Sequence, residues 1–142
     1  MPIVALDHYN ICTADLAVAR RFYTEVVGLH DGERPPFGRP GAWMYVGTQA
    51  ILHISTARIP GTAKSDAFDH VAFRAEGLAQ TRARLDDHGI RYQSFAVPDR
   101  ELVQVFFRDP DGAEIELIFS GTEAAAAIAE GVTSDATLNR TA

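Results

Sequence analysis

The stretch ALDHYNI at residues 5–11 returns as AFDHVAF at residues 67–73. His8 and His70 occupy the same place in the two copies, 62 positions apart, and an aspartate precedes each of them. A recurring segment of this kind indicates an internal duplication of the chain. Two copies predict a closed, pseudo-symmetric pair of half-domains, because a solenoid needs at least three repeats to be stable.

A second pair of positions follows nearly the same spacing. His53, in AILHIS, lies 63 positions before Glu116, in AEIELI. If the two copies pack about a pseudo-twofold axis, these positions converge on the axis, and three imidazoles with one carboxylate are typical ligands of a divalent metal. A single histidine on a strand is more often an ordinary hydrogen-bonded residue than a ligand. The duplication is what favours a metal site at His8, His53, His70 and Glu116.

Hydrophobic periodicity predicts a similar order of elements in each half of the chain. In the first half it predicts a strand, a helix, a loop and two strands, at residues 3–12, 16–26, 30–41, 42–46 and 50–55. In the second half it predicts a strand, a helix and three strands, at residues 68–74, 78–89, 92–97, 102–108 and 113–119. The composition predicts a linker at residues 56–66, and a short helix at residues 123–130 within an Ala-rich end.

Strand alternation separates polar from apolar faces in both halves. His53 lies opposite Leu52 and Ile54 on its predicted strand, and Glu116 likewise lies opposite its apolar neighbours. We expect the apolar faces to pack under the helices, which leaves the histidines and the carboxylate on the concave side of a curved sheet. A carboxylate within an apolar strand is costly unless it is paired or bound to a metal. Glu116 is therefore the residue that most requires a partner.

Composition and charge restrict the class of protein. A chain of 142 residues with 46% apolar residues is long and apolar enough to bury an ordinary core. Its net charge of −6 comes without a basic stripe, so we expect no nucleic-acid partner. No apolar run approaches the ~18 residues of a membrane span, so we expect no membrane partner. The sequence contains one cysteine and shows no signal-peptide pattern at MPIVALDHYN, and we expect a cytoplasmic protein.

Three stretches of the chain resemble one known family. They are similar to the opening strand and helix, to the start of the second module and to the closing hairpin of the vicinal oxygen chelate superfamily. This superfamily is also called the glyoxalase, bleomycin-resistance and dioxygenase family. The stretches are LDHYNICTADLAVARRFYTEVVGL (6–29), FDHVAFRA (68–75) and VFFRDPDGAEIELIF (105–119).

The resemblance implies a fold and an assembly. The fold is α+β, with two βαβββ modules that form a curved, cup-like mixed sheet and carry their helices outside. The modules occupy residues 1–60 and 61–120 in this interpretation, and a C-terminal extension follows at residues 121–142. Because family members are often dimers, we also expect a homodimer.

The resemblance also assigns roles to the paired positions. His8, His70 and Glu116 fall on the family's three metal-ligand positions, a set that leaves coordination sites open and suits Fe²⁺ first, with Zn²⁺, Ni²⁺ or Mn²⁺ as alternatives. His53 falls where bacterial glyoxalase I enzymes have a glutamate ligand, and where extradiol dioxygenases have an acid/base histidine. The resemblance therefore leaves two roles for His53: a fourth metal ligand or an acid/base residue. His53 and Glu116 are the candidate catalytic residues.

The family implies an enzyme that chelates a small-molecule substrate through adjacent oxygens. The first expectation is an extradiol-type dioxygenase. The alternatives are a glyoxalase-type isomerase, epimerase or lyase, and a non-catalytic protein that binds a small molecule such as an antibiotic. Phe106 stands where an extradiol enzyme usually has a tyrosine, and Cys12 stands where a glutathione-using glyoxalase has an arginine. The loop from Arg34 to Trp43 is either a lid over the substrate or a plain connection between strands.

Overall fold

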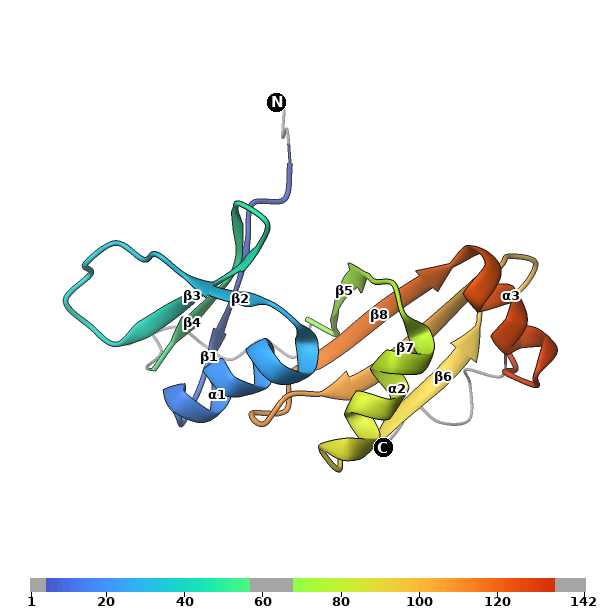
Figure 1. Cartoon of the computed structure of the whole chain (residues 1–142). Helices are drawn as coiled ribbons and strands as arrows, with labels where there is room; N and C mark the ends of the chain where they lie inside the picture. The colour runs from blue at the N-terminus through green and yellow to red at the C-terminus, as the bar shows by residue number, and fades with distance from the viewer. Residues whose placement is uncertain (1–4, 57–67, 135–142) are drawn as a thin grey trace. The chain divides into compact units, whose positions relative to one another are not determined.

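The computed structural model describes residues 5–56 and 68–134. The chain divides into two compact units, Met1–Ser65 and Asp66–Ala142. Each unit contains one four-stranded mixed sheet, and the elements are labelled in Figure 1. In these two stretches no helix is long and apolar enough to cross a membrane.

The first unit is built around a central strand that carries His53. Its elements are β1 (Tyr9–Cys12), α1 (Leu16–Phe22), the π-helix η1 (Tyr23–Val27), β2 (His30–Gly32), β3 (Gly41–Val46) and β4 (Gln49–Ser55). The strand order is β1-β4-β3-β2, with β1 parallel to β4 and the other neighbours antiparallel. The carboxylate of Asp15 accepts a hydrogen bond from the backbone N–H of Val18 and so begins α1. Gly28, with φ of 90°, ends η1 in the left-handed conformation that favours glycine.

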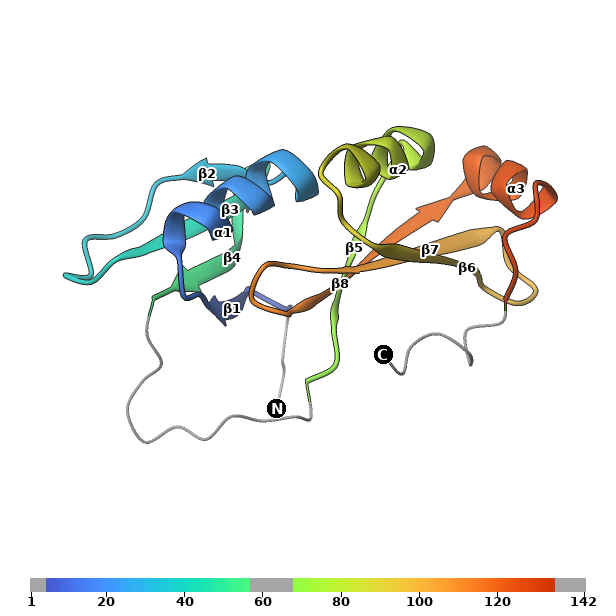
Figure 2. The same cartoon turned by 90° about the horizontal axis from the view of Figure 1, so that it is seen from below.

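One face of this first sheet is apolar and packs against the helix. Leu52 and Ile54 of β4, with Ala42 and Met44 of β3, are buried there. Figure 2 shows α1 on one side of the sheet, and α1 contacts β3 and β4. The alternate residues of these strands face the other way, because successive strand residues point to opposite sides. His53 therefore lies on the face away from α1.

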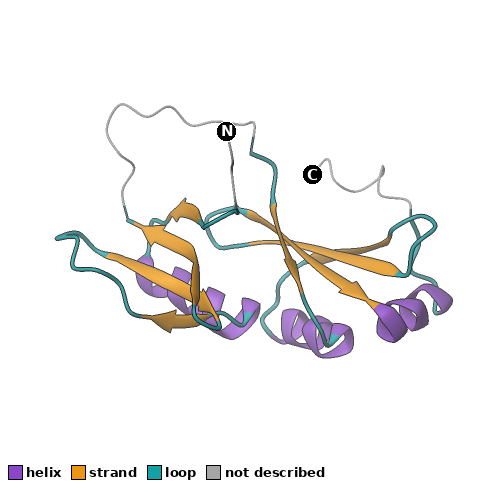
Figure 3. Ribbon diagram, turned by 90° about the horizontal axis from the view of Figure 1, so that it is seen from above, coloured by secondary structure: helices purple, strands orange, loops and turns teal. Residues whose placement is uncertain are grey.

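The second unit repeats the strand order of the first. Its elements are β5 (Val71–Arg74), α2 (Leu78–Asp87), β6 (Tyr92–Ala96), β7 (Leu102–Arg108), β8 (Glu114–Ser120) and α3 (Gly121–Ala129). The order is β5-β8-β7-β6, with β5 parallel to β8. The two helices of this unit lie on the same side of its strands (Figure 3). The buried residues between them and the strands include Leu85, Val103, Val105, Ile115 and Phe119.

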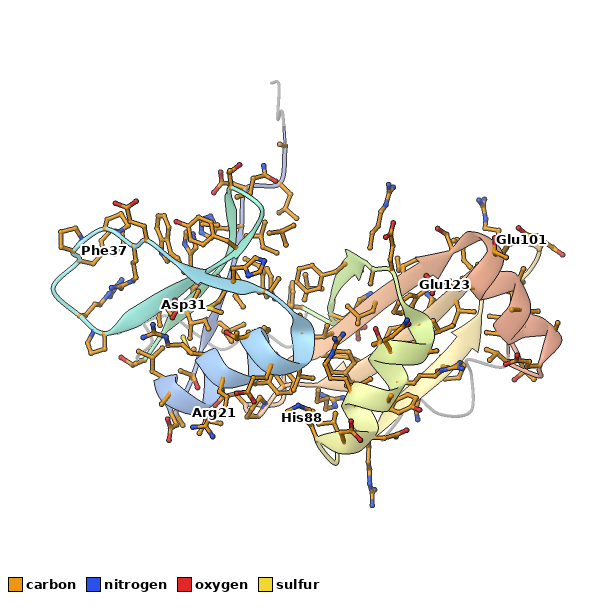
Figure 4. All side chains as sticks on the ribbon, in the orientation of Figure 1. Arg21, Asp31, Phe37, His88, Glu101 and Glu123 are labelled. Carbon is orange, nitrogen blue, oxygen red and sulfur yellow. The ribbon has the colours of Figure 1, made fainter. Side chains whose placement is uncertain are left out.

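The start of α2 receives its cap from another helix. Gly77 at the N-cap position has no side chain to accept hydrogen bonds, so the first N–H groups of α2 need an external acceptor. The carboxylate of Glu123, near the start of α3, accepts from the N–H groups of Gly77 and Leu78, the latter at 2.7 Å. Glu123 is labelled in Figure 4. This contact fixes α3 against the beginning of α2.

The structure confirms the predicted α+β fold of two βαβββ-like modules, with local differences. The prediction of a loop from residue 30 is wrong for His30–Gly32, which pair with β3 as strand β2. All three residues are exposed, so this strand has no apolar alternation to reveal it. The first strand is shorter than predicted, because β1 pairs with β4 only from Tyr9 onward. The linker from residue 57 and the beginning of the first strand, residues 3–4, lie outside the described ranges.

Candidate functional site

In the first unit the two predicted histidines are in direct contact. His8 directly precedes β1, and His53 lies in β4, which pairs in parallel with β1. Their rings stack with centroids 3.7 Å apart and planes 17° from parallel. The indole of Trp43, which is paired with His53 across β3 and β4, covers the other face of the His53 ring at 4.1 Å and 5°. His53 is thus held between two flat rings.

The His53 imidazole is favoured in its neutral form. Burial lowers its pKa below the ordinary value of 6.5, and the electrostatic interaction with the neighbouring His8 ring lowers the pKa further. The charge of Asp7 and a hydrogen bond with the backbone of Ala50 act in the opposite direction and are weaker. At neutral pH the ring therefore carries one nitrogen lone pair, which can accept a proton or bind a metal.

In the second unit His70 and Glu116 are in direct contact. Glu116 lies in the middle of β8 and is only 4% exposed. Its Oε2 atom is 2.8 Å from Nε2 of His70, and its Oε1 atom accepts a hydrogen bond of 2.8 Å from Nε2 of Gln104. The ring of Phe106 meets the His70 ring edge to face, at 5.8 Å. The expected partner of the buried carboxylate is therefore present within its own unit.

Gln104 contacts the candidate site residue Glu116 and was not predicted from the sequence. It lies on β7, two residues before Phe106, which is the residue paired with Glu116 across β7 and β8. Residues two apart on a strand share a face. The available signal was a polar residue alternating within the apolar run Leu102–Arg108. Gln104 holds one carboxylate oxygen, so the other stays directed at His70.

An aspartate braces the histidine at the equivalent place in each unit. Nδ1 of His8 lies 2.7 Å from Oδ2 of Asp7, and Nδ1 of His70 lies 2.7 Å from Oδ2 of Asp69. An ionised carboxylate can only accept, so Nδ1 is the donor in both contacts. In a neutral His8 ring Nε2 then carries the lone pair, whereas Nε2 of His70 faces Oε2 of Glu116 at 2.8 Å. Metal-bound histidines commonly have a carboxylate on the opposite ring nitrogen in this way.

The geometry around His70 fits a divalent cation. A neutral imidazole has one N–H group, and Asp69 and Glu116 both approach nitrogens of this ring. Nε2 of His70 and Oε2 of Glu116 are 2.8 Å apart, and both would be ligands of a bound divalent cation.

The stacked rings of His8 and His53, unlike the His70–Glu116 pair, are not arranged to bind one metal ion together. An imidazole binds a metal in its ring plane, along the nitrogen lone pair. Two nearly parallel rings 3.7 Å apart keep their lone pairs in separate, nearly parallel planes, so in this conformation the two rings do not bind one ion together. Within either unit, the residues described by the structure contain no group of three or more His, Cys, Asp or Glu side chains able to hold a metal. Each unit supplies one pair of the predicted site residues.

Comparisons with known proteins place the chain in a family. Residues 5–117 match the model of the Glyoxalase/Bleomycin resistance protein/Dioxygenase superfamily. A relative named Glyoxylase I 4, from Arabidopsis thaliana, is 26% identical over 122 residues, which cover 81% of this chain and 70% of the relative. A crystal structure of a putative glyoxalase family protein from Bacillus anthracis has a TM-score of 0.66 at 26% identity and covers 85% of this chain and 98% of its own.

A further solved structure shares the fold at lower identity. It is an antibiotic-binding protein from a Streptomyces species, with a TM-score of 0.65 at 20% identity, covering 85% of this chain and 99% of its own. At that identity the likeness concerns the fold alone. The family match extends over most of the sequence, including His8, His53, His70 and Glu116. This chain is a member of the glyoxalase/bleomycin resistance protein/dioxygenase superfamily.

Proposed function

We propose that this protein is a metal-dependent enzyme that chelates a small substrate through adjacent oxygens. In this proposal His8, His70 and Glu116 hold a divalent cation, and His53 exchanges a proton with the substrate. When bound, the cation stabilises negative charge on the chelating oxygens. The main support is the contact of Nε2 of His70 with Oε2 of Glu116, on a ring whose Nδ1 is braced by Asp69.

The first unit supports the same ligand chemistry at His8. Asp7 holds Nδ1 of His8 as Asp69 holds Nδ1 of His70. Two histidines and one carboxylate leave coordination positions for a bidentate substrate and suit Fe²⁺, with Zn²⁺, Ni²⁺ and Mn²⁺ as the alternatives.

The surroundings of His53 support the proposed proton-transfer role. Its lowered pKa keeps the ring neutral near pH 7, as a general base requires. The stack with His8 disfavours ligation of one ion by both rings. We therefore choose the acid/base role for His53 over the role of fourth ligand.

The first candidate reaction is proton abstraction next to a chelated carbonyl, as in an isomerase, epimerase or lyase. Two observations favour it: the relative named Glyoxylase I 4, and the bare ring of Phe106 beside His70, which supplies no hydroxyl group. The test is incorporation of solvent deuterium into 2-ketoacids or hemithioacetals, with protein loaded with Zn²⁺, Ni²⁺ or Mn²⁺. We expect exchange with wild-type protein and none with His53→Gln. If no metal supports exchange, this reaction is rejected.

The second candidate is an extradiol-type dioxygenase. The two-histidine, one-carboxylate set favours it, because this set is typical of Fe²⁺ oxygenases. Protein loaded with Fe²⁺ without oxygen is then mixed with oxygenated catechols, and oxygen uptake is recorded. Uptake that depends on His70 and Glu116 would support this reaction, and its absence with every diol would exclude it for that panel.

Metal content separates both enzyme reactions from simple small-molecule binding. We expect elemental analysis of protein purified without a histidine tag to show about one divalent ion per protein chain. His8→Ala should lose that ion while its circular dichroism spectrum is retained, because His8 precedes β1 and is exposed. A wild-type protein that binds no divalent metal under any loading condition would contradict the proposed function.

A further inference from the structure

Trp43, the chain's single tryptophan, lies outside the hydrophobic core of its unit. Its strand neighbours Ala42 and Met44 are buried under α1, whereas Trp43 shares the opposite face with His53. A large aromatic side chain on that face does little to hold the sheet to its helix. Trp43 contacts the rings of Phe37 and His53, and His53 is the proposed proton carrier.

The contact with His53 restrains the orientation of the imidazole. The indole plane is 5° from the imidazole plane with centroids 4.1 Å apart, and His8 covers the opposite face at 3.7 Å. A ring covered on both faces cannot turn about its side-chain bonds without displacing a neighbour. The ring edge, which carries both nitrogens, is not covered by either stack. His53 is thereby restricted to one plane and keeps an edge for chemistry.

The loop before β3 restrains the indole in turn. The ring of Phe37 meets Trp43 at 6.1 Å and 44°, and the guanidinium of Arg34 lies over the Phe37 ring at 4.9 Å. Arg34 also donates a hydrogen bond of 3.1 Å from Nη1 to the carbonyl of Arg39. Figure 4 labels Phe37 in this loop. The contacts form a continuous row of Arg34, Phe37, Trp43, His53 and His8.

Gly41 is required for this arrangement. A Cβ atom at position 41 would lie 2.6 Å from Nη2 of Arg34 and 2.7 Å from the backbone oxygen of Ile54. The backbone atom cannot move aside cheaply. The absence of a side chain at the start of β3 therefore allows Arg34 to reach its position over Phe37.

We propose that Trp43 is a positioning residue that holds the His53 imidazole in its proton-transfer orientation. The proposal rests on the proposed function for its catalytic meaning, although the restraint itself concerns only the first unit. It assigns the loop from Arg34 to Arg39 the task of supporting the indole. Trp43 itself transfers no proton and binds no metal.

The restraint is tested on metal-free protein with isotopically labelled histidine. In wild-type protein the His53 ring protons should be shifted upfield by the stacked indole, and relaxation should show a rigid ring. Trp43→Leu should remove the shift and leave the ring mobile, whereas Trp43→Phe should retain most of the rigidity because it keeps a flat ring. Tyr45→Leu is the matched control, since Tyr45 lies on the same strand and hydrogen-bonds the carbonyl of Glu33. A His53 ring that stays as rigid in Trp43→Leu as in wild-type protein would overturn the proposal.

The catalytic consequence is tested on the metal-loaded enzyme. With a substrate found by deuterium exchange or oxygen uptake, Trp43→Leu should lower kcat about 10- to 100-fold, as expected for a misplaced catalytic group, with KM and metal content nearly unchanged. Trp43→Phe should restore most of kcat. A purely structural Trp43 would lower the melting temperature and leave kcat of the folded protein intact, which would reject the role. If wild-type protein has a rigid His53 ring but neither metal nor turnover, the proposed function fails while the restraint stands.

Discussion

The two units use the same strand order for two different contacts. In the first unit the strand pair β1 and β4 brings His8 against His53 as a ring stack. In the second, β8 and the residue just before β5 bring Glu116 against His70, with Oε2 of Glu116 2.8 Å from Nε2 of His70. The position that holds an imidazole on β4 holds a carboxylate on β8. A duplicated scaffold can therefore place two kinds of group at equivalent points, one suited to moving a proton and the other suited to holding a cation.

The largest expected effect comes from neutralising the carboxylate of the second unit. Glu116→Gln keeps the shape and the contact with Gln104 but removes the charge that a cation requires. Loss of a residue that only hydrogen-bonds a metal ligand already weakens metal binding about 10- to 100-fold. Glu116 is proposed as a ligand itself, so we expect more than about 100-fold weaker metal binding. Competition with a calibrated chelator measures this loss.

The matched control for that change is Glu114→Gln, two residues earlier on the same strand. Glu114→Gln also removes one negative charge from the face of β8 that carries Glu116. It leaves the contact between His70 and Glu116 intact. We expect unchanged metal affinity in this variant. Equal losses in both variants would mean that general electrostatics, rather than ligation by Glu116, accounts for metal binding.

The second prediction tests whether His53 on β4 and Glu116 on β8, which occupy equivalent positions, have different roles. His53→Gln should retain the metal and lower kcat by roughly 100- to 10,000-fold, the usual contribution of a general acid or base. Elemental analysis and steady-state kinetics on the same preparation give both quantities. If His53→Gln loses metal as completely as Glu116→Gln, His53 is a ligand, and the proposed division of roles between the units is wrong.

The sequence predicted the fold better than the contacts between side chains within each unit. The repeat around His8 and His70 placed the equivalent positions correctly, because strand and helix periodicity depend on the residues themselves. The stack of Trp43 on His53 escaped prediction, since it depends on the register between β3 and β4 and on side-chain rotamers. Gln104 escaped for the same reason. Such cross-strand contacts need a register that one sequence does not provide.

A smaller effect concerns the two aspartate braces. Asp7→Asn and Asp69→Asn keep the size of each side chain but replace a charged acceptor by a neutral amide. We expect each to weaken metal binding about 10- to 100-fold, as loss of such partners does elsewhere. Chelator competition on both variants compares the loss of metal affinity caused by Asp7→Asn with the loss caused by Asp69→Asn. A large loss for Asp69→Asn with none for Asp7→Asn would indicate that His8 is not a ligand.

The smallest effect is the pH dependence that the first unit adds to the stability of metal-free protein. The pKa of His53 is lowered by burial and by His8, so below the ordinary value of 6.5 the unfolded chain binds a proton that the folded protein resists. The stabilisation is therefore complete above about pH 6.5 and is lost as the pH falls toward the lower pKa of the folded state. Urea unfolding at several pH values should show a steeper loss of the free energy of unfolding in wild-type protein than in His53→Gln. Identical pH profiles would show that the stacked ring titrates like an ordinary imidazole, and the neutral base proposed for the first unit would lose its physical support.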